Sequence, residues 1–164
     1  MTLDALFDWL ETTQIAQFMQ VSPWAFPTVE AFHVMAISVV VGVIAAVDLR
    51  LLGFAFGERP IRQMLSELLP FVWIAFVAAV ATGSLMFVTS ASSYAHNQPF
   101  ISKMVCLAYA GVNMLVFEFG VLRSVKEGDL GRPGWGARLS GGFSICIWIA
   151  IVSLGRWIGF TKIG

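Results

Sequence analysis

The sequence is poor in charge, and it contains only two histidines and two cysteines. Charged residues make up 12% of the 164 positions, about half of the roughly 25% that is usual in soluble domains. The formal net charge is zero, so no basic surface is available for nucleic acid. Hydrophobic residues reach 58%, with a mean hydropathy of +0.81. A soluble domain of this size could not cover so much apolar surface, which predicts that lipid solvates much of it.

The scarce residue types also exclude several kinds of site. Cys106 and Cys146 form no CxxC or Cys/His zinc spacing, and the predicted topology puts them in opposite halves of the membrane, too far apart for a disulfide. No Ser/His/Asp set and no pair of catalytic carboxylates occurs at a suitable depth, so a stand-alone hydrolytic enzyme is the least favoured class. The first twenty residues carry Asp4, Asp8 and Glu11 but no Lys or Arg. This is the opposite of a secretory signal, and the segment is predicted to stay in the mature protein.

Four apolar runs are long enough to cross a bilayer, because about 20 residues of helix span its hydrocarbon core. They cover residues 28–52, 69–89, 100–122 and 139–160. Small residues recur at every fourth position in parts of the first two runs, which lets neighbouring helices approach closely. The predicted fold is therefore an all-α, polytopic membrane protein. It is a single membrane domain, residues 1–164, built as a bundle of four transmembrane helices.

Residues 1–27 precede the first run and are predicted to lie at the membrane surface. Within residues 2–20, apolar residues recur at helical intervals among acids and glutamines. This is typical of an amphipathic interfacial helix, and a loosely ordered terminus is the alternative. Pro23 and Pro27 interrupt the helix, and Trp24 between them suits the headgroup level.

The orientation follows from the distribution of Lys and Arg, which gather on the cytoplasmic side of membrane proteins. One side holds seven of them: Arg50, Arg59, Arg62, Arg123, Lys126, Arg132 and Arg138. The other side holds three: Lys103, Arg156 and Lys162. The sequence therefore predicts that both termini face the periplasm of a bacterial inner membrane.

Depth along the predicted spans brings four ionisable residues into one layer near the outer surface. His33 lies roughly 7–8 Å inside the first span by helical rise, and Glu30 shares its helix face. Lys103 and Arg156 lie about one turn from the outer ends of the third and fourth spans. Ionisable groups inside a membrane face the protein interior or water and usually pair, so Glu30 is expected to pair with Lys103 or Arg156. Alternatively, the two cations only reach toward the interface and fix the register of the helices.

This outer layer has the parts that a b-type haem requires. A neutral imidazole is a common axial ligand of haem iron, and His33 is the expected ligand because it sits on a rigid span. Cations at matching depth would pair with the haem propionates. The predicted cofactor-binding residues are His33, Glu30, Lys103, Arg156, Trp157 and, as a second ligand from the loop outside, His96.

Copper is the competing occupant of the same region. Thioethers and a thiolate select Cu(I), and imidazole suits copper generally. The predicted metal-binding residues are His33, His96, Met35 and Met104, with Met86 and Cys106 also in the outer half. Methionine in an apolar helix more often serves packing alone.

A second polar layer is predicted at the inner ends of the spans. It comprises Asp48, Arg50, Glu118 and Arg123. Asp48 and Arg50 are two residues apart and point in different directions, so each needs a partner on another helix. The expected partners are Arg62 or Arg123 for Asp48, and Glu118 for Arg50. This layer is interpreted as structural.

Several stretches together resemble a group of small, uncharacterised bacterial inner-membrane proteins with four helices. These stretches are F-P-T-V-E-A-F-H with D-L-R-L-L-G, N-Q-P-F-I-S-K-M with G-V-N-M-L-V-F-E, and G-R-W-I-G-F. The resemblance covers the first, third and fourth spans and implies no established activity. More distantly, the layout is similar to copper-resistance D-type membrane proteins and four-helix b-type cytochromes. That similarity implies haem or copper at His33, although the chain has no second histidine within a span.

The leading functional hypothesis is an integral membrane redox or metal-handling subunit that binds b-type haem through His33 near the periplasmic face. A transport or relay protein for copper or protons is the second. Asn113 lies between the two polar layers, where it either joins a proton route or simply makes a helix–helix hydrogen bond. A cofactor-free membrane anchor of a partner enzyme is the third. The expected partners are the lipid bilayer and either further copies of the chain or other subunits of a membrane complex.

Overall fold

The computed structural model describes residues 3–121 and 133–161, which are almost entirely helical. The elements in chain order are α1 (Leu3–Glu11), α2 (Gln14–Val21), α3 (Ala25–Leu52), α4 (Ile61–Val88), α5 (Ala91–Ala95), α6 (Gln98–Val116), the π-helix η1 (Phe117–Val121) and α7 (Trp135–Thr161). Within the described ranges, α3, α4, α6 and α7 are the helices long and apolar enough to span a membrane. The predicted all-α architecture with four membrane-spanning helices is confirmed.

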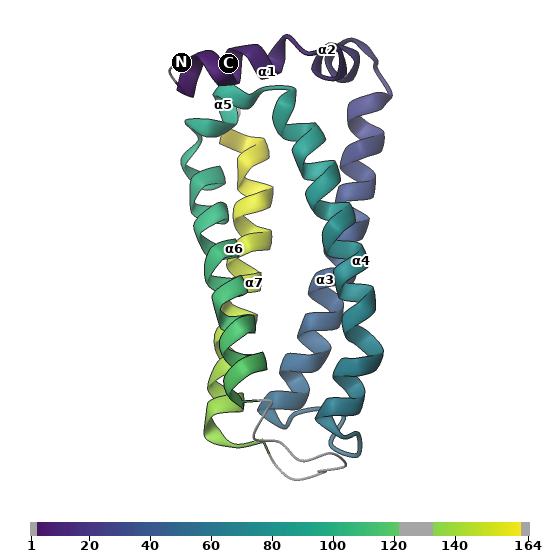
Figure 1. Cartoon of the computed structure of the whole chain (residues 1–164), viewed down its shortest axis with the longest axis vertical. Helices are drawn as coiled ribbons and strands as arrows, with labels where there is room; N and C mark the ends of the chain where they lie inside the picture. Colours follow the sequence, from purple (N-terminus) through teal and green to yellow (C-terminus); the bar gives the residue numbers. More distant parts are fainter. Residues whose placement is uncertain (1–2, 122–132, 162–164) are drawn as a thin grey trace.

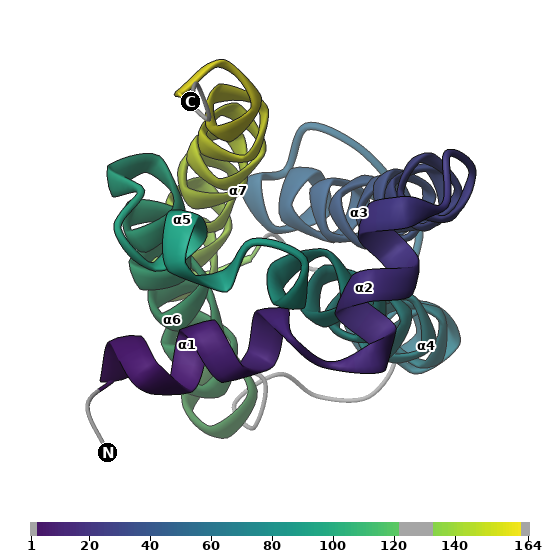
Figure 2. The ribbon, with the colours of Figure 1, turned by 90° about the horizontal axis from the view of Figure 1, so that it is seen from above.

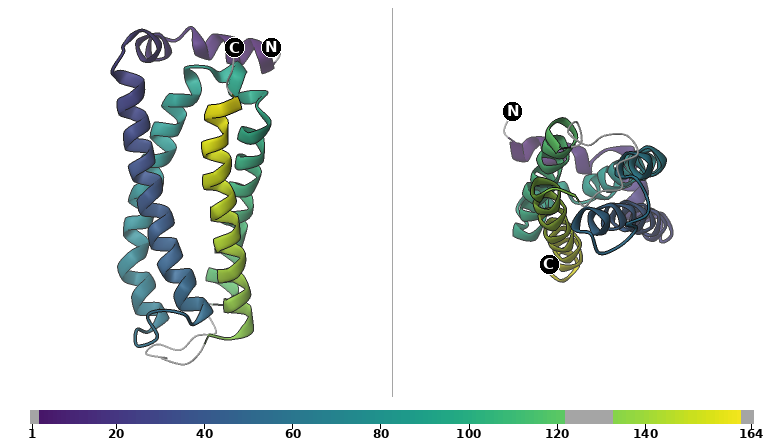
Figure 3. Two further views of the ribbon diagram at one scale, coloured as in Figure 1. Left: turned by 180° about the vertical axis from the view of Figure 1, so that it is seen from behind. Right: turned by 90° about the horizontal axis from the view of Figure 1, so that it is seen from below.

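The four long helices run along the molecule as two antiparallel pairs (Figures 1 and 3). Helix α3 packs against α4, and α6 packs against α7. The pairs are joined chiefly where α3 meets α7, whereas α4 and α6 meet mainly through the stacked rings of Phe87 and Phe100, whose centroids are 5.6 Å apart. Groups that reach the space between the pairs therefore come from helices that are held together mainly by the α3–α7 contact.

The N-terminal segment lies across the end of the bundle at which α7 ends, as the view from above shows (Figure 2). It forms two short helices, α1 and α2, where the sequence predicted a single helix over 2–20. Thr13 causes the break. Its hydroxyl donates to the Leu10 carbonyl at 2.7 Å and accepts from the Ala16 N–H at 3.4 Å, so it caps a new helix.

Helix α3 begins slightly earlier than predicted, at Ala25, so Pro27 lies in its first turn, where a missing N–H costs nothing. The helix ends at Gly53, whose φ of +83° is left-handed and favours glycine. The Gly53 N–H donates to the Arg50 carbonyl, and that of Phe54 donates to the Leu49 carbonyl. These bonds satisfy the last carbonyls of the helix in the manner of a left-handed cap.

Helix α4 corrects the sequence prediction for the second span, which was expected to begin at residue 69. It begins at Ile61, and its first turns are continuous with the apolar part. Ile61, Met64 and Leu65 are spaced as one helix face and are all buried, so packing extends the helix across the predicted interfacial turns. Pro70 therefore lies inside the helix and not in its first turn, which removes one backbone hydrogen bond there.

The other span limits also shift by a few residues. Helix α6 ends at Val116 and continues as the π-helix η1 to Val121. Helix α7 begins at Trp135, where the Arg138 guanidinium lies 5.5 Å from the Trp135 ring centroid. Between α4 and α6, part of the predicted polar loop forms the short helix α5.

The buried core lies mainly on α3, α4 and α7. One cluster joins Leu51, Ile61, Leu65 and Ala137, and another joins Val40, Val72 and Ala75. Helix α6 contributes no buried residue to the described core. Large apolar side chains cover the outside instead, among them Phe71, Ile74 and Val77 on α4 and Ile149 on α7. An exterior of this kind is suited to lipid.

The closest approach between α3 and α7 occurs at Gly141. A Cβ atom there would lie 3.0 Å from the Leu51 Cβ and 3.2 Å from the Asp48 carbonyl oxygen. At the next residue, Gly142, a Cβ would meet nothing nearer than Leu52 Cδ2 at 3.8 Å. The hydrogen atom of Gly141 is therefore what lets the two helix pairs meet.

We predict that Gly141→Ala destabilises the protein by about 1–3 kcal/mol relative to Gly142→Ala, because it overpacks the α3–α7 contact. Both substitutions gain the same helix propensity, roughly 1 kcal/mol, so their difference isolates the clash. Thermal unfolding of the two variants in the same detergent measures this difference. Equal stability of the two variants would contradict the inferred close contact.

Candidate functional site

His33 lies in the upper half of the bundle, where its ring bridges α3 and α4. Its Nδ1 is 2.9 Å from the Thr82 hydroxyl oxygen. The Thr82 hydroxyl donates its proton to the Ala78 carbonyl at 2.6 Å, so its oxygen accepts from the ring Nδ1–H. In a neutral ring this leaves the lone pair on Nε2, the nitrogen that a metal or haem iron would use.

Two glycines make room for the polar side chains at this level. The His33 Cε1 lies 3.0 Å from the position of a Cβ on Gly83, so the ring occupies the space that a side chain would fill. Lys103, half-buried on α6, places its Nζ 3.6 Å from the Cβ position of Gly155 on α7. We call these five residues, His33, Thr82, Gly83, Lys103 and Gly155, the His33 layer.

The charges predicted to surround His33 are partly assembled. Lys103 and Glu30 both interact electrostatically with the ring. Glu30 is exposed, and among the described residues it makes no direct ion pair with Lys103 or Arg156. The expected Glu30 pair is therefore absent there, and Lys103 is the cation that reaches the layer from the other helix pair.

Arg156 and Trp157 lie outside the layer. Arg156 is exposed, and its guanidinium lies 5.2 Å from the centroid of the Phe160 ring. Trp157 is 61% exposed. Both follow Gly155 directly, but at 100° per residue they point away from the face that receives Lys103. Their positions suit the headgroup region of a bilayer.

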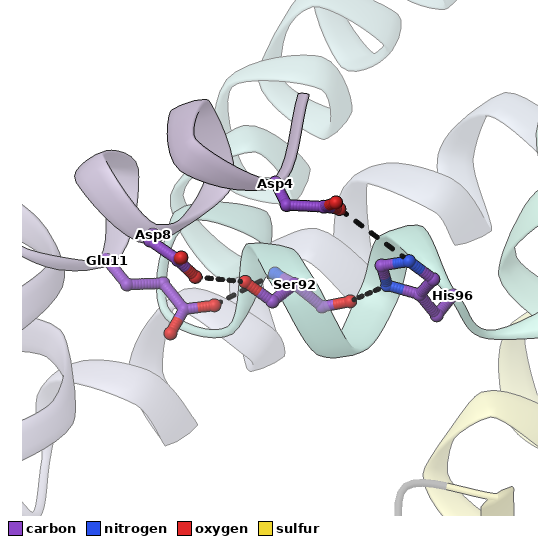
Figure 4. A network of polar contacts seen from close by, with 5 residues as sticks. All are labelled: Asp4, Asp8, Glu11, Ser92 and His96. Atoms are coloured by element: carbon purple, nitrogen blue, oxygen red, sulfur yellow. Dashed lines mark hydrogen bonds and ion pairs between the residues drawn. The ribbon is translucent and has the colours of Figure 1, made fainter. Parts of the chain in front are cut away.

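His96 is held at the surface by the N-terminal helix (Figure 4). Its Nε2 lies 3.8 Å from the Asp4 Oδ1, and its Nδ1 lies 2.9 Å from the Ser92 carbonyl oxygen. The side chain is exposed, at the end of α5. The second imidazole thus has partners of its own outside the His33 layer.

The acids of α1 have a role that the sequence did not suggest. Asp4, Asp8 and Glu11 share one face of the helix, and all three contact the α5 region (Figure 4). The Ser92 N–H donates to Glu11 Oε1 at 2.8 Å, and the Ser92 hydroxyl donates to Asp8 Oδ1 at 3.1 Å. A free backbone N–H at the start of a helix is the usual partner of a carboxylate, so these acids attach α1 to the bundle.

The methionines considered for copper are largely on the outside. Met35 is 54% exposed, and it lies two residues from His33, on the opposite side of α3. Met104 is 50% exposed. Cys106 and Cys146 are both free. Within the described ranges, no group of three His, Cys, Asp or Glu side chains is placed to hold a metal ion.

The inner polar residues lie where α3, α6 and α7 meet. Asp48 is 4% exposed, and the Ser144 hydroxyl of α7 lies near its carboxyl. Asn113 of α6 exchanges two hydrogen bonds with Ser140, of 3.2 Å and 3.0 Å, which confirms the predicted helix–helix bond. The two serines, four residues apart on α7, thus serve two neighbouring helices. Sequence analysis missed them because serine in an apolar span carries no charge to signal its role.

Arg50 is buried at the start of the α3–α4 connection. Its Nε donates to the Arg59 carbonyl oxygen at 3.0 Å. Within the described residues, Arg50 Nη2 and Asp48 Oδ2 are buried atoms without a hydrogen-bond partner. Of the three partners predicted for them, Arg62, Glu118 and Arg123, the last two lie outside the side chains that the structure describes.

These features define a class: an α-helical, multi-pass membrane protein with polar side chains bonded between its spans. The chain belongs to a family of unknown function (DUF6644), whose model matches residues 6–161. The expectation of an uncharacterised family is thereby confirmed. No curated protein and no solved structure matches the chain significantly.

We predict that Glu11→Ala loosens α1 from the bundle. Hydrogen exchange of the α1 amides should accelerate by roughly an order of magnitude, because a hydrogen bond to a charged acceptor contributes about 1.5–3 kcal/mol. Gln14→Ala, an exposed change in the same segment, is the control and should leave exchange unchanged. If Glu11→Ala does not alter exchange in α1, the carboxylate–Ser92 contact does not hold the helix.

Proposed function

We propose that the chain is a membrane-embedded redox subunit that binds a b-type haem through His33. The observation that carries this proposal is the orientation of the imidazole, whose Nδ1 is engaged by Thr82 and whose Nε2 is left as the basic nitrogen. A ligand histidine in a protein is usually fixed in this way by a hydrogen bond through its other nitrogen. Haem, when bound, supplies one-electron chemistry.

The residues around His33 support a haem in three ways. Thr82 holds the ring against rotation, which is the role of an outer partner to a ligand. Lys103 enters from the opposite helix pair and offers a cation to a propionate carboxylate. The helices that carry Thr82 and Lys103, α4 and α6, pack little against each other apart from the stacked rings of Phe87 and Phe100, so contact between the two sides of the site is confined mainly to that stack.

The proposal assigns one protein ligand to the iron. His96 is occupied by Asp4 and Ser92 at the surface, so His33 serves alone. The positive-inside distribution of Lys and Arg would place this site near the periplasmic face, with both termini on that side of a bacterial inner membrane. In that setting the electron partner is a periplasmic protein or a neighbouring membrane subunit.

Proton relay is a second candidate function, and a specific observation favours it. Polar groups contact a neighbouring helix at three levels: partly buried at His33 and at Asn113 with Ser140, and buried at Asp48 with Ser144. Ionisable groups inside a membrane commonly mark proton routes. A relay through these levels would require water between them.

We predict that protein purified from haem-replete cells shows a Soret band that shifts on reduction, and that His33→Ala loses it. His96→Ala is the matched control, because it removes the other imidazole of the chain and should keep the band. Thr82→Val should retain haem but change its reduction potential, since it removes only the hydrogen bond to the ligand.

The outcomes separate the candidate functions. A colourless wild-type protein, or a band that survives His33→Ala, contradicts the haem site. Colourless protein that binds Cu(I) supports copper handling instead. Colourless protein that conducts protons in liposomes, and stops doing so in Asp48→Asn, supports the relay. Colourless protein without either property that co-purifies with another membrane subunit supports the anchor hypothesis.

A further inference from the structure

A groove opens along the contact between α3 and α7, away from the His33 layer. Its cavity volume is about 250 Å³. The walls are apolar and comprise Val41, Ile44, Ala45, Trp148, Ile149 and Val152. One charged side chain lines it, that of Asp48, and Ser153 is a further polar lining residue. Because Ile149 is 62% exposed on the outside of the bundle, the groove is accessible from the surface that faces lipid.

Asp48 is the unusual feature of this groove. The residue is 4% exposed, and the Ser144 hydroxyl is the polar side-chain group that lies near its carboxyl. The second carboxyl oxygen, Oδ2, has no partner within the described part of the chain. A buried carboxyl oxygen without a partner is costly, and Asp48 also lines an apolar cavity large enough for a ligand.

The chemistry of the lining selects the kind of ligand. A hydrated metal ion needs several oxygen ligands, whereas one carboxylate and a single hydroxyl stand among apolar side chains. A neutral lipid tail would fill the apolar part but leave the carboxyl oxygen unsatisfied. A molecule with one positive group and one apolar group would pair with the carboxyl and also fill the apolar part. The face of the Trp148 indole would attract the cation as well.

The position of the carboxyl along the helix suits such a molecule. Asp48 lies four residues before the end of α3, or about 6 Å by helical rise, and so close to one membrane surface. The apolar part of the groove extends from there to Val41, about 10 Å toward the bilayer centre. A ligand would therefore lie as a lipid does, with its charge near the interface and its apolar part inward.

We propose that the α3–α7 groove binds a small lipophilic cation of the aryl- or alkylammonium class, whose positive end pairs with Asp48. The cavity is smaller than the roughly 300–1,000 Å³ typical of drug-sized pockets, so the ligand is of the size of a substituted benzylammonium. The site is separate from the His33 layer and does not depend on haem.

The test compares two probes of the same shape, one charged and one neutral. Benzyltrimethylammonium carries a permanent positive charge, and neopentylbenzene has carbon in place of its nitrogen. Each is titrated into the protein in phosphatidylcholine nanodiscs, whose lipid has no net charge. The indole N–H signal of Trp148, assigned through Trp148→Phe, reports occupancy of the groove.

The cation should shift this signal saturably, and the neutral probe should bind at least about tenfold more weakly, because it leaves the carboxylate unpaired. Asp48→Asn should weaken binding of the cation by at least about tenfold and leave binding of the neutral probe unchanged. Glu67→Gln, an exposed acid on α4 outside the groove, is the matched control and should change neither. His33→Ala should bind the cation normally, which separates this site from the haem proposal.

Ala45→Phe provides a second variant that keeps the carboxyl but fills the cavity, and it should abolish the shift. Two results overturn the proposal. One is equal binding of both probes with no effect of Asp48→Asn, which assigns the groove to apolar molecules such as lipid tails. The other is no saturable shift by the cation up to about 10 mM in a folded protein.

Discussion

The contact between α3 and α7 is the interaction on which the rest of the bundle depends. At Gly141 the two backbones come so close that a Cβ would touch both the Leu51 side chain and the Asp48 carbonyl. One turn further on, the Ser144 hydroxyl lies near the Asp48 carboxyl. Lipid offers no hydrophobic driving force between helices, so close van der Waals contact and interhelical hydrogen bonds have to supply the association. Because α4 and α6 meet mainly through the Phe87–Phe100 ring stack, the α3–α7 contact also positions the helix that carries His33 relative to the α6–α7 pair.

The polar side chains within the spans follow from the same solvent. Hydrocarbon provides no hydrogen-bond partner, and polar groups therefore turn to a neighbouring helix: His33 bonds to Thr82, Asn113 bonds to Ser140, and Asp48 lies near the Ser144 hydroxyl. The unpaired atoms Asp48 Oδ2 and Arg50 Nη2 depart from this rule within the described residues. Asp48 also lines a cavity, and its buried carboxyl group there is the physical basis of the cation proposal.

The end of the bundle that carries α1 and α2 is organised by charge. Three acids of α1 meet α5, and Phe7 makes an edge-to-face contact with Phe87 of α4. His96, at the end of α5, takes part in this arrangement through its contact with Asp4. The two histidines of the chain therefore have different surroundings, one between spans and one at the surface, although both belong to the same half of the molecule. Only the first lies between two membrane-spanning helices, bonded to Thr82.

Much of the architecture is determined by the sequence itself. Four long apolar runs, few charges and an amphipathic N-terminal segment leave a helical membrane bundle as the outcome, because backbone polar groups in lipid must be satisfied within each segment. The same constraint predicted that ionisable groups would gather in layers, and it identified His33 and Lys103 as members of one. The span limits were predicted less accurately. The sequence of residues 61–68 suggested interfacial turns, and only the burial of its apolar face shows that it belongs to α4.

What only the tertiary structure decided is which side chains meet. Arg156 lies one residue from Gly155, yet the rotation of α7 turns it away from Lys103. Ser144 and Thr82 carry no charge and give no signal in an apolar run, but helix packing makes them partners of Asp48 and His33. Residue type and depth along a span follow from local sequence, because they depend on one helix at a time. Rotation about the helix axis and contact across an interface depend on two helices together, and only their packing fixes these.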